Sequence, residues 1–194
     1  MRAIDDPATG RIFRRKQTAS VVKRLFSQQA TLIRQGWLRR RASFARLQPN
    51  ESILVEDPDD WLLRHTYRLV KHLLVAGHQE ILQALVEEVG TRHGSRHDIG
   101  EQPFKQALLA MFWWHEGATS APVLTRQRRS EWGDAMEYAR RHNVPSKYFC
   151  AFARQCRLKN IGYKLQAGHR EPGFKLNEAR PDSPQQPPTM PSNS

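Results

Sequence analysis

The chain has 194 residues, which is enough for one domain with its own hydrophobic core or for two small domains. It carries 31 Lys and Arg against 19 Asp and Glu, a net charge of +12, which favours a polyanionic partner: nucleic acid first, an anionic membrane surface second. Cys150 and Cys156 are too few for a disulfide framework, and no apolar run has the length of a membrane-spanning helix.

Residues 1–16 are polar and are interrupted by Pro7 and Gly10, so we expect a flexible basic arm. From 18 to 47, apolar residues recur at helical spacing and predict a long helix with most of its arginines off the apolar stripe. The stripe consists of Val22, Phe26, Ile33, Trp37 and Phe44. Gly36 weakens such a helix by ~1 kcal/mol relative to Ala, so we expect a kink or a break near it.

The next helix is predicted to begin at Asp57 and Pro58, because aspartate caps a helix N-terminus and proline suits the first helical position. Gly77 is expected to kink or split this helix. The amphipathic segment that follows is expected to end at Gly90, a natural C-terminal cap. Pro103 then opens a helix that is apolar on most of its circumference, which predicts the most buried helix of the fold.

Two further helices are predicted in the C-terminal third of the chain. The first covers 130–142, with Ser130 as its cap, and the second runs from Ser146 to about 163. Repeated prolines among Ser, Gln and Asn predict a disordered tail over 167–194. No alternating strand pattern occurs, so the predicted fold is all-α, with about six helices in a single compact, bundle-like domain over 17–166.

The segment 135–154 fits a helix-turn-helix frame, which we place within a unit covering 131–164. Ala139 is the small residue that lets the second helix cross closely, and Asn143 tolerates the left-handed backbone of the turn. The apolar residues that wedge the helices together are Val144, Phe149 and Phe152. His142 stands where an apolar residue is expected. The alternative is a basic-faced hairpin that only packs on the core.

Positive charge is concentrated in two blocks. Residues 1–50 hold 12 basic and 2 acidic side chains, net +10, and residues 122–170 hold 11 and 3, net +8. Between these blocks, residues 51–121 hold 6 basic and 11 acidic side chains, net −5. Residues 171–194 hold 2 basic and 3 acidic side chains, net −1, so the net charges of the four segments sum to +12. This distribution is typical of a packed centre with two binding arms. Alternatively, the acidic middle pairs with the basic blocks inside one fold.

Arginines and lysines of both blocks are the candidate nucleic-acid contacts. Arg154 is the best candidate for reading guanine, because its guanidinium fork matches two acceptors, and Lys147 is placed to reach a base edge or a phosphate. The other candidate contacts are Arg34, Arg39, Arg40, Arg41, Arg126, Arg128, Arg129, Arg140, Arg141, Arg157, Lys159 and Lys164. Trp37 and Phe44, beside the first basic run, either stack on bases or belong to the core.

Metal-binding and catalytic patterns are weak. His93 and His97 lack a third ligand at a suitable spacing, and the two cysteines have the wrong spacing for zinc. The neighbours His115 and Glu116 lack the third group that an acid–base site needs. We therefore expect no metal, no cofactor and no enzymatic activity.

The first functional hypothesis is a DNA-binding protein that uses the helix-turn-helix unit and the basic N-terminal helix. The alternative is a helical structural or assembly subunit of a nucleoprotein complex, such as a phage, plasmid or CRISPR-type small subunit. Such a subunit contacts the nucleic-acid backbone without reading sequence and has protein partners. A third class, a protein-interaction scaffold around 101–114, binds no nucleic acid. For the first two hypotheses we expect DNA as the ligand more than RNA, and no membrane partner. We also expect a cytoplasmic or nucleoid-associated protein that is not secreted, because no apolar signal block follows the basic N-terminus.

Overall fold

The computed structural model describes residues 12–47, 55–93, 102–112, 124–157 and 160–173. Every regular element within these ranges is helical, seven α-helices and one short 3-10 helix, which confirms the all-α prediction. The elements are α1 (Ala19–Phe44), α3 (Pro58–Val75), α4 (Glu80–His93), α5 (Pro103–Phe112), α6 (Arg126–Arg141), η1 (Ser146–Tyr148), α7 (Phe149–Gln155) and α8 (Ile161–Gln166).

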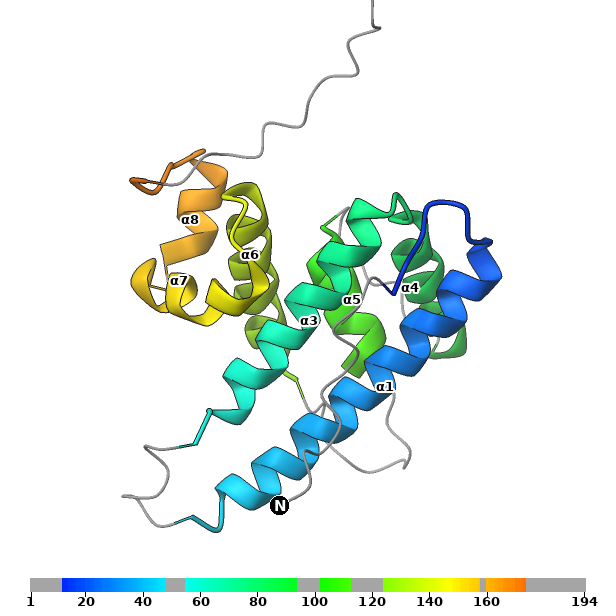
Figure 1. The fold of residues 1–194 in the computed structure, drawn as a ribbon, viewed down its shortest axis with the longest axis horizontal. Helices are drawn as coiled ribbons and strands as arrows, with labels where there is room; N and C mark the ends of the chain where they lie inside the picture. Colours follow the sequence, from blue (N-terminus) through cyan, green and yellow to red (C-terminus); the bar gives the residue numbers. More distant parts are fainter. Residues whose placement is uncertain (1–11, 48–54, 94–101, 113–123, 158–159, 174–194) are drawn as a thin grey trace, which may run out of the picture.

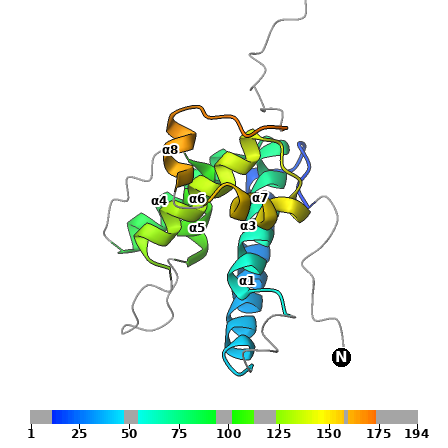
Figure 2. The ribbon, with the colours of Figure 1, turned by 90° about the vertical axis from the view of Figure 1, so that its left-hand side faces the viewer.

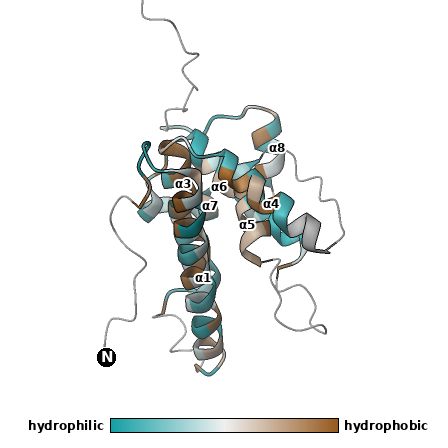
Figure 3. Cartoon of the chain, turned by 90° about the vertical axis from the view of Figure 1, so that its right-hand side faces the viewer, coloured by the Kyte–Doolittle hydropathy of each residue, from teal (hydrophilic) through white to brown (hydrophobic). Residues whose placement is uncertain are grey.

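The helices are arranged around α5. α1 and α3 lie side by side in opposite directions, α5 packs between them and the helices α4 and α6, and α7 and α8 pack on α6 (Figure 1). α5 contacts α1, α3, α4 and α6, and all its residues except Lys105 and Ala110 are buried, so the prediction of the most buried helix is confirmed. Figure 3 shows that α5 is largely hydrophobic, whereas much of α1 is hydrophilic. None of the described helices combines the length and apolarity that crossing a membrane requires.

Tyr67 of α3 joins α5 to α7 in the aromatic core. Its ring stacks on Phe104 of α5, with centroids 5.7 Å apart, and on Phe149 of α7, with centroids 4.8 Å apart. All three side chains are completely buried. Aromatic pairs at these separations add stabilisation beyond the area they bury. The turn before α7 is therefore held directly against the centre of the molecule.

The α1 helix runs without interruption through Gly36, so the predicted kink or break is wrong. Gly36 is buried against Trp61 of α3, and a Cβ at this position would lie 2.6 Å from the Cη2 atom of the indole. The glycine therefore lets α1 and α3 approach closely. Its cost in helix propensity, ~1 kcal/mol, is small beside the burial of an indole.

Both ends of α3 form as predicted. The carboxylate of Asp57 accepts the backbone N–H groups of Asp59 and Asp60, and Pro58 occupies the first helical position. At the other end Gly77 adopts a φ of +82°, and its N–H and that of His78 bond to carbonyls of the last turn. This arrangement is the Schellman motif, which here separates α3 from α4.

Two predicted boundaries are wrong. α4 continues through Gly90 to His93, because a single glycine costs too little to end a helix that packs along α5. α6 begins at Arg126 rather than at Ser130. Its cap is Thr125, whose hydroxyl accepts a backbone N–H three residues ahead at 3.2 Å.

The helix predicted from Ser146 to about 163 is divided into η1, α7 and α8. Arg157 follows α7 with a φ of +58°, a left-handed conformation that ends an α-helix. Its N–H bonds to the carbonyl of Arg154 at 3.2 Å. Because arginine rarely adopts a left-handed backbone, neither this residue nor the apolar pattern around it indicates that the helix ends here.

The last residues of the predicted N-terminal arm are packed on the helical body. Phe13 is buried, and the carbonyl of Arg14 lies 2.9 Å from Nε2 of His78, in the turn between α3 and α4. Residues 1–11 lie outside the described part of the chain.

The first residues of the predicted tail are packed as well. Glu171 accepts hydrogen bonds from the Tyr138 hydroxyl at 2.9 Å and from Lys164 Nζ at 2.5 Å. Burial acts to raise the pKa of Glu171, but the bonds from Lys164 and Tyr138 outweigh it and hold that pKa below its ordinary value. The segment 167–173 therefore rests on α6 and α8, and 174–194 lies outside the described residues.

Candidate nucleic-acid interface

Arginines from three separate segments meet around the first turn of α3. The Arg40 guanidinium of α1 lies over the Trp61 ring, with its Cζ 4.4 Å from the ring centroid. One residue on, Arg41 lies over Trp37 at 4.9 Å, and the indole N–H of Trp37 donates to Asp59 at 2.9 Å. The long N-terminal helix therefore brings its basic end to the acidic start of α3.

The second basic block reaches the same turn. Arg128 of α6 forms an ion pair with Asp59 at 3.2 Å and lies 5.1 Å from the centroid of Trp132, and Arg154 of α7 forms an ion pair with Asp60. We call Arg40, Arg41, Arg128 and Arg154 the arginine cluster. Two blocks that are far apart in sequence thus contribute to one surface. The C-terminal end of α1, which carries part of this surface, extends beyond the other helices (Figure 2).

The carboxylates beneath the cluster hold its arginines only loosely. The side chain of Arg154 is 68% exposed and that of Arg128 is 48% exposed. Asp59 and Asp60 are 30% and 21% exposed, so water still reaches both carboxylates when an arginine turns to a phosphate oxygen. Burial raises the pKa of Asp60 above its ordinary value, and the opposing effect of Arg154 does not offset it.

Further cations beside the cluster have no carboxylate of the described residues within ion-pair distance. Arg39 and Arg126 are exposed, and Arg129 is half-buried. Burial lowers the pKa of Arg129, and the positive charge of Arg126 lowers it further. This part of the surface therefore carries more positive charge than its own carboxylates balance.

Arg140 and Arg141 lie in a different environment, at the C-terminal end of α6. Arg140 forms two hydrogen bonds to Glu137, at 2.8 and 2.6 Å, and Arg141 forms one at 3.2 Å. The Glu137 side chain is only 5% exposed. Hydrogen bonding to Glu137 raises the pKa of Arg140 above its ordinary value. Both arginines were predicted to contact a nucleic-acid backbone; in the structure they share one buried carboxylate, Glu137, while their own side chains are 35% and 46% exposed.

The remaining predicted contacts are dispersed. Lys164 is bound to Glu171, and Arg157 is exposed at the end of α7. Lys147 is exposed in η1, with its Nζ 4.6 Å from the centroid of the Tyr148 ring. Lys159 lies outside the described residues.

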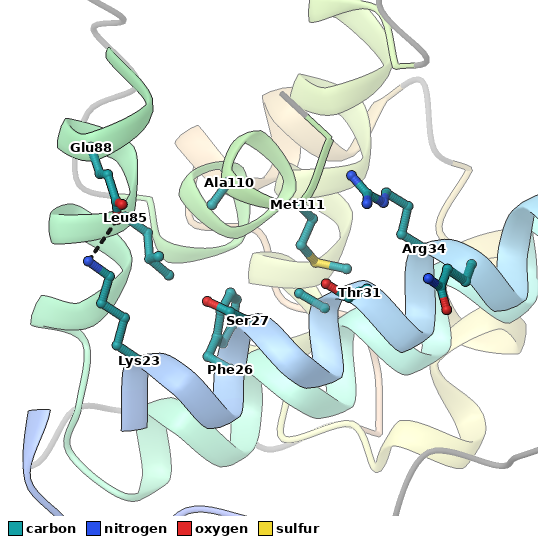
Figure 4. Close-up of a pocket in the computed structure, with 11 residues that line it drawn as sticks. Lys23, Phe26, Ser27, Thr31, Arg34, Leu85, Glu88, Ala110 and Met111 are labelled. Carbon is teal, nitrogen blue, oxygen red and sulfur yellow. Dashed lines mark ion pairs between the residues drawn. The ribbon is translucent and has the colours of Figure 1, made fainter. Parts of the chain in front are cut away.

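Arg34 lies about two turns along α1 from the cluster. It lines a pocket of about 470 Å³ between α1, α4 and α5 (Figure 4). At the other end of the pocket, Lys23 forms an ion pair with Glu88 at 2.7 Å. Phe26 and Met111 supply apolar parts of the wall. Arg34 therefore belongs to a separate surface.

The turn between α6 and α7 has the predicted helix-turn-helix features. Asn143 adopts a φ of +56°, and its N–H and that of Val144 bond to the last turn of α6 in a Schellman motif. Ala139 and Val144 are completely buried. The Val144 carbonyl accepts the Tyr67 hydroxyl at 2.8 Å and Lys71 Nζ at 2.9 Å, which fixes the turn to α3.

His142 fits the unit in a way that the sequence did not reveal. The ring is buried, its Nδ1 lies 2.8 Å from the Tyr138 carbonyl, and its Nε2 accepts the backbone N–H of Glu171 at 3.0 Å. This pattern requires the neutral ring with its proton on Nδ1. A polar residue thus takes the expected apolar position because both of its nitrogens are hydrogen-bonded.

The face of α7 that was predicted to read bases is partly packed. The Cys150 thiol donates to the Asp60 carbonyl at 3.3 Å, and burial raises the pKa of that thiol to about 12. Arg154, on the same face, is bound to Asp60. Lys147, the other residue predicted to reach a base edge, lies in η1 and is exposed, without a hydrogen bond or ion pair to α3 among the described residues.

The aromatic residues of α1 belong to the core. Trp37 is completely buried, with Phe112 edge-on to its ring at 5.4 Å, and Phe44 is half-buried. The interpretation that Trp37 stacks on bases is therefore wrong. The mainly exposed aromatic side chains of the described residues are instead Tyr148 at 55% and Tyr163 at 76%. In the sequence, only the neighbouring Lys147 indicated that Tyr148 is exposed.

Within the described part of the chain, no three His, Cys, Asp or Glu side chains come together as a candidate metal site. His97, His115 and Glu116 lie outside the described residues. Comparisons of the chain with protein-family models, with curated proteins and with solved structures found no match.

Proposed function

We propose that this chain binds the phosphate backbone of nucleic acid through the arginine cluster and the arginines beside it. The observation that carries the proposal is the convergence of guanidinium groups from α1, α6 and α7 on the first turn of α3. Guanidinium is the side-chain group best matched to phosphate, because its fork of N–H donors engages two oxygens at once.

The cluster is also organised before a ligand arrives. Arg40, Arg41 and Arg128 each lie over a tryptophan ring. A guanidinium held in this way has already lost part of its rotational freedom, so less conformational entropy is lost when a phosphate binds. The rings themselves are buried, so they position the cations rather than contact bases.

This geometry favours backbone binding without sequence readout, as in a structural or assembly subunit of a nucleoprotein complex. A reading helix needs a free face to enter a groove. In α7 that face is in contact with α3 through Cys150 and Arg154. Contacts to phosphate fix position and supply affinity, and they carry no sequence information directly.

Sequence-reading DNA binding is the second candidate, and the α6–α7 turn favours it. The left-handed Asn143 and the buried Val144 give the turn that a helix-turn-helix unit needs, and Lys147 stands exposed at the start of the second helical segment. In this function Arg154 leaves Asp60 and contacts a base edge.

A binding experiment across a salt series tests the proposal and separates the two candidates. Duplex DNA, single-stranded DNA and RNA of one mixed sequence are each titrated with the protein. We expect binding at low salt that weakens as log salt rises, with a slope of about −0.7 to −0.9 per phosphate contact. Absence of binding to all three at low salt overturns the proposal.

Variants at Arg154 and Lys147 decide between the candidates. In a backbone binder, Arg154→Ala lowers affinity evenly across duplex sequences and reduces the salt slope by about one contact. In a sequence reader, Arg154→Ala or Lys147→Ala removes discrimination between duplex sequences by about 1–3 kcal/mol.

A further inference from the structure

We infer that Tyr148 is a stacking platform for an unpaired base, so that the preferred ligand of this chain is single-stranded nucleic acid. The inference rests on the proposed function and specifies its substrate class. The juxtaposition that carries it is an exposed ring in η1, with Lys147 beside it and Arg154 of the arginine cluster further along the same helical segment.

The Tyr148 ring is exposed although everything around its backbone is fixed. The preceding turn is clamped to α3, since Val144 accepts bonds from Tyr67 and Lys71. The Tyr148 N–H bonds to the Pro145 carbonyl at 2.9 Å, and the next side chain, Phe149, is completely buried. A ring held at a rigid position and 55% exposed offers contact area at a low entropic cost.

Two cations of the same helical segment are available to the backbone of a single strand. Lys147 Nζ lies over one face of the ring, 4.6 Å from its centroid, so a base stacks on the other face or displaces the ammonium group, which can then pair with a phosphate of the same strand. Arg154 lies six residues after Tyr148, a rise of about 9 Å along a helix and about 120° round its axis. A short stretch of one strand can therefore stack on Tyr148 while its backbone reaches Arg154 and the rest of the cluster.

The same features are poorly suited to intact duplex DNA. A paired base presents only its edge, and its faces are covered by its neighbours in the stack, so an aromatic ring gains little from it. The reading face of α7 is engaged with α3 through Cys150 and Arg154. A ring available for stacking beside cations for phosphate is the combination found in non-specific single-strand binding.

The test compares Tyr148→Ala with wild type on a single-stranded oligonucleotide of mixed sequence and on the matched duplex. We expect tighter wild-type binding to the single strand, and a loss of roughly 5- to 100-fold on it in Tyr148→Ala, with little change on the duplex. Tyr148→Phe should retain wild-type affinity, because stacking needs the ring and not the hydroxyl.

Tyr163→Ala is the matched control, because Tyr163 is also exposed and its variant should bind as wild type does. A strand with abasic sites should bind wild type no better than Tyr148→Ala binds the intact strand. Unchanged single-strand affinity in Tyr148→Ala, or an equal loss on strand and duplex, overturns the inference and leaves the proposed function standing. If wild type binds neither ligand at low salt, both fall together.

Discussion

The arginine cluster and the C-terminal end of α6 contain the same kind of residue in two different environments. At the cluster, Arg128 and Arg154 are paired with Asp59 and Asp60 and remain largely exposed. At the end of α6, two arginines bind one carboxylate, Glu137, that is itself buried. The carboxylates differ more than the arginines do: Asp59 and Asp60 are 30% and 21% exposed, whereas Glu137 is 5% exposed.

We infer from this contrast that burial of the carboxylate, and not the number of arginines, decides whether an arginine is held as a structural ion pair. A buried carboxylate needs its cationic partners, because an unpaired buried charge is costly. Asp59 and Asp60, at 30% and 21% exposed, depend on their partners less, because water still reaches them. Each of the following experiments tests one side of this comparison.

The largest effect is expected from Glu137→Ala. Loss of its carboxylate removes charge-assisted hydrogen bonds to Arg140 and Arg141 and leaves a cavity among buried residues. We expect a loss of about 3 kcal/mol in the free energy of unfolding, measured by urea denaturation. A loss below about 1 kcal/mol, the value typical of an exposed pair, would contradict the structural role.

A smaller loss of stability is expected from Gly36→Ala. The new Cβ meets the Trp61 ring at 2.6 Å, and Arg40 lies over the same ring. Overpacking of this kind costs about 1–3 kcal/mol, against a gain of ~1 kcal/mol in helix propensity. Thermal unfolding should show a net loss, together with weaker nucleic-acid binding because the platform under Arg40 shifts. A gain in stability would show that the close approach of α1 and α3 is not needed.

Arg128→Ala should change binding more than folding. Its ion pair with Asp59 is exposed, so we expect a change of less than about 1 kcal/mol in the free energy of unfolding. Removal of one phosphate contact should reduce the salt slope by about one. A fluorescence anisotropy titration at two salt concentrations checks this. An unchanged slope would remove Arg128 from the interface.

The smallest effect is expected from Asp60→Asn, which removes the carboxylate that competes for Arg154. Affinity for nucleic acid should rise by about threefold, in keeping with the low strength of an exposed ion pair. Stability should not fall at neutral pH. Burial raises the pKa of Asp60 in the folded protein above its ordinary value of 3.8. The ionised carboxylate therefore destabilises the fold at pH values above the raised pKa, and this destabilisation is absent below pH 3.8, where Asp60 is protonated in both states. Weaker binding in Asp60→Asn would show that Asp60 positions Arg154 for the ligand.

Much of the fold was predictable because local rules and tertiary packing agree. The Asp57 cap, the Gly77 break and the apolar helix after Pro103 all appear. Predictions failed where packing overrode local preference, as at Gly36, where an indole fills the space beside the glycine. Predictions also failed at Arg157, because an arginine in the sequence does not indicate a left-handed backbone.

The candidate site was predictable only in part. The charge blocks indicated arginines of both ends of the chain, and Arg40, Arg128 and Arg154 do converge on the first turn of α3. Their meeting point at Asp59 and Asp60 was not predictable, because it depends on how helices far apart in sequence pack. Arg140 and Arg141 had the same local sequence signal, and only the burial of Glu137 sets them apart.

The most direct test of the central claim measures the salt slope of single-strand binding for two matched variants. One variant replaces Arg40, Arg128 and Arg154 with alanine, and the other replaces Arg140 and Arg141. We predict that the first lowers the slope by about 2, at about 0.7 per lost contact, and that the second leaves it unchanged. An equal reduction in both variants, or none in the first, would contradict the account.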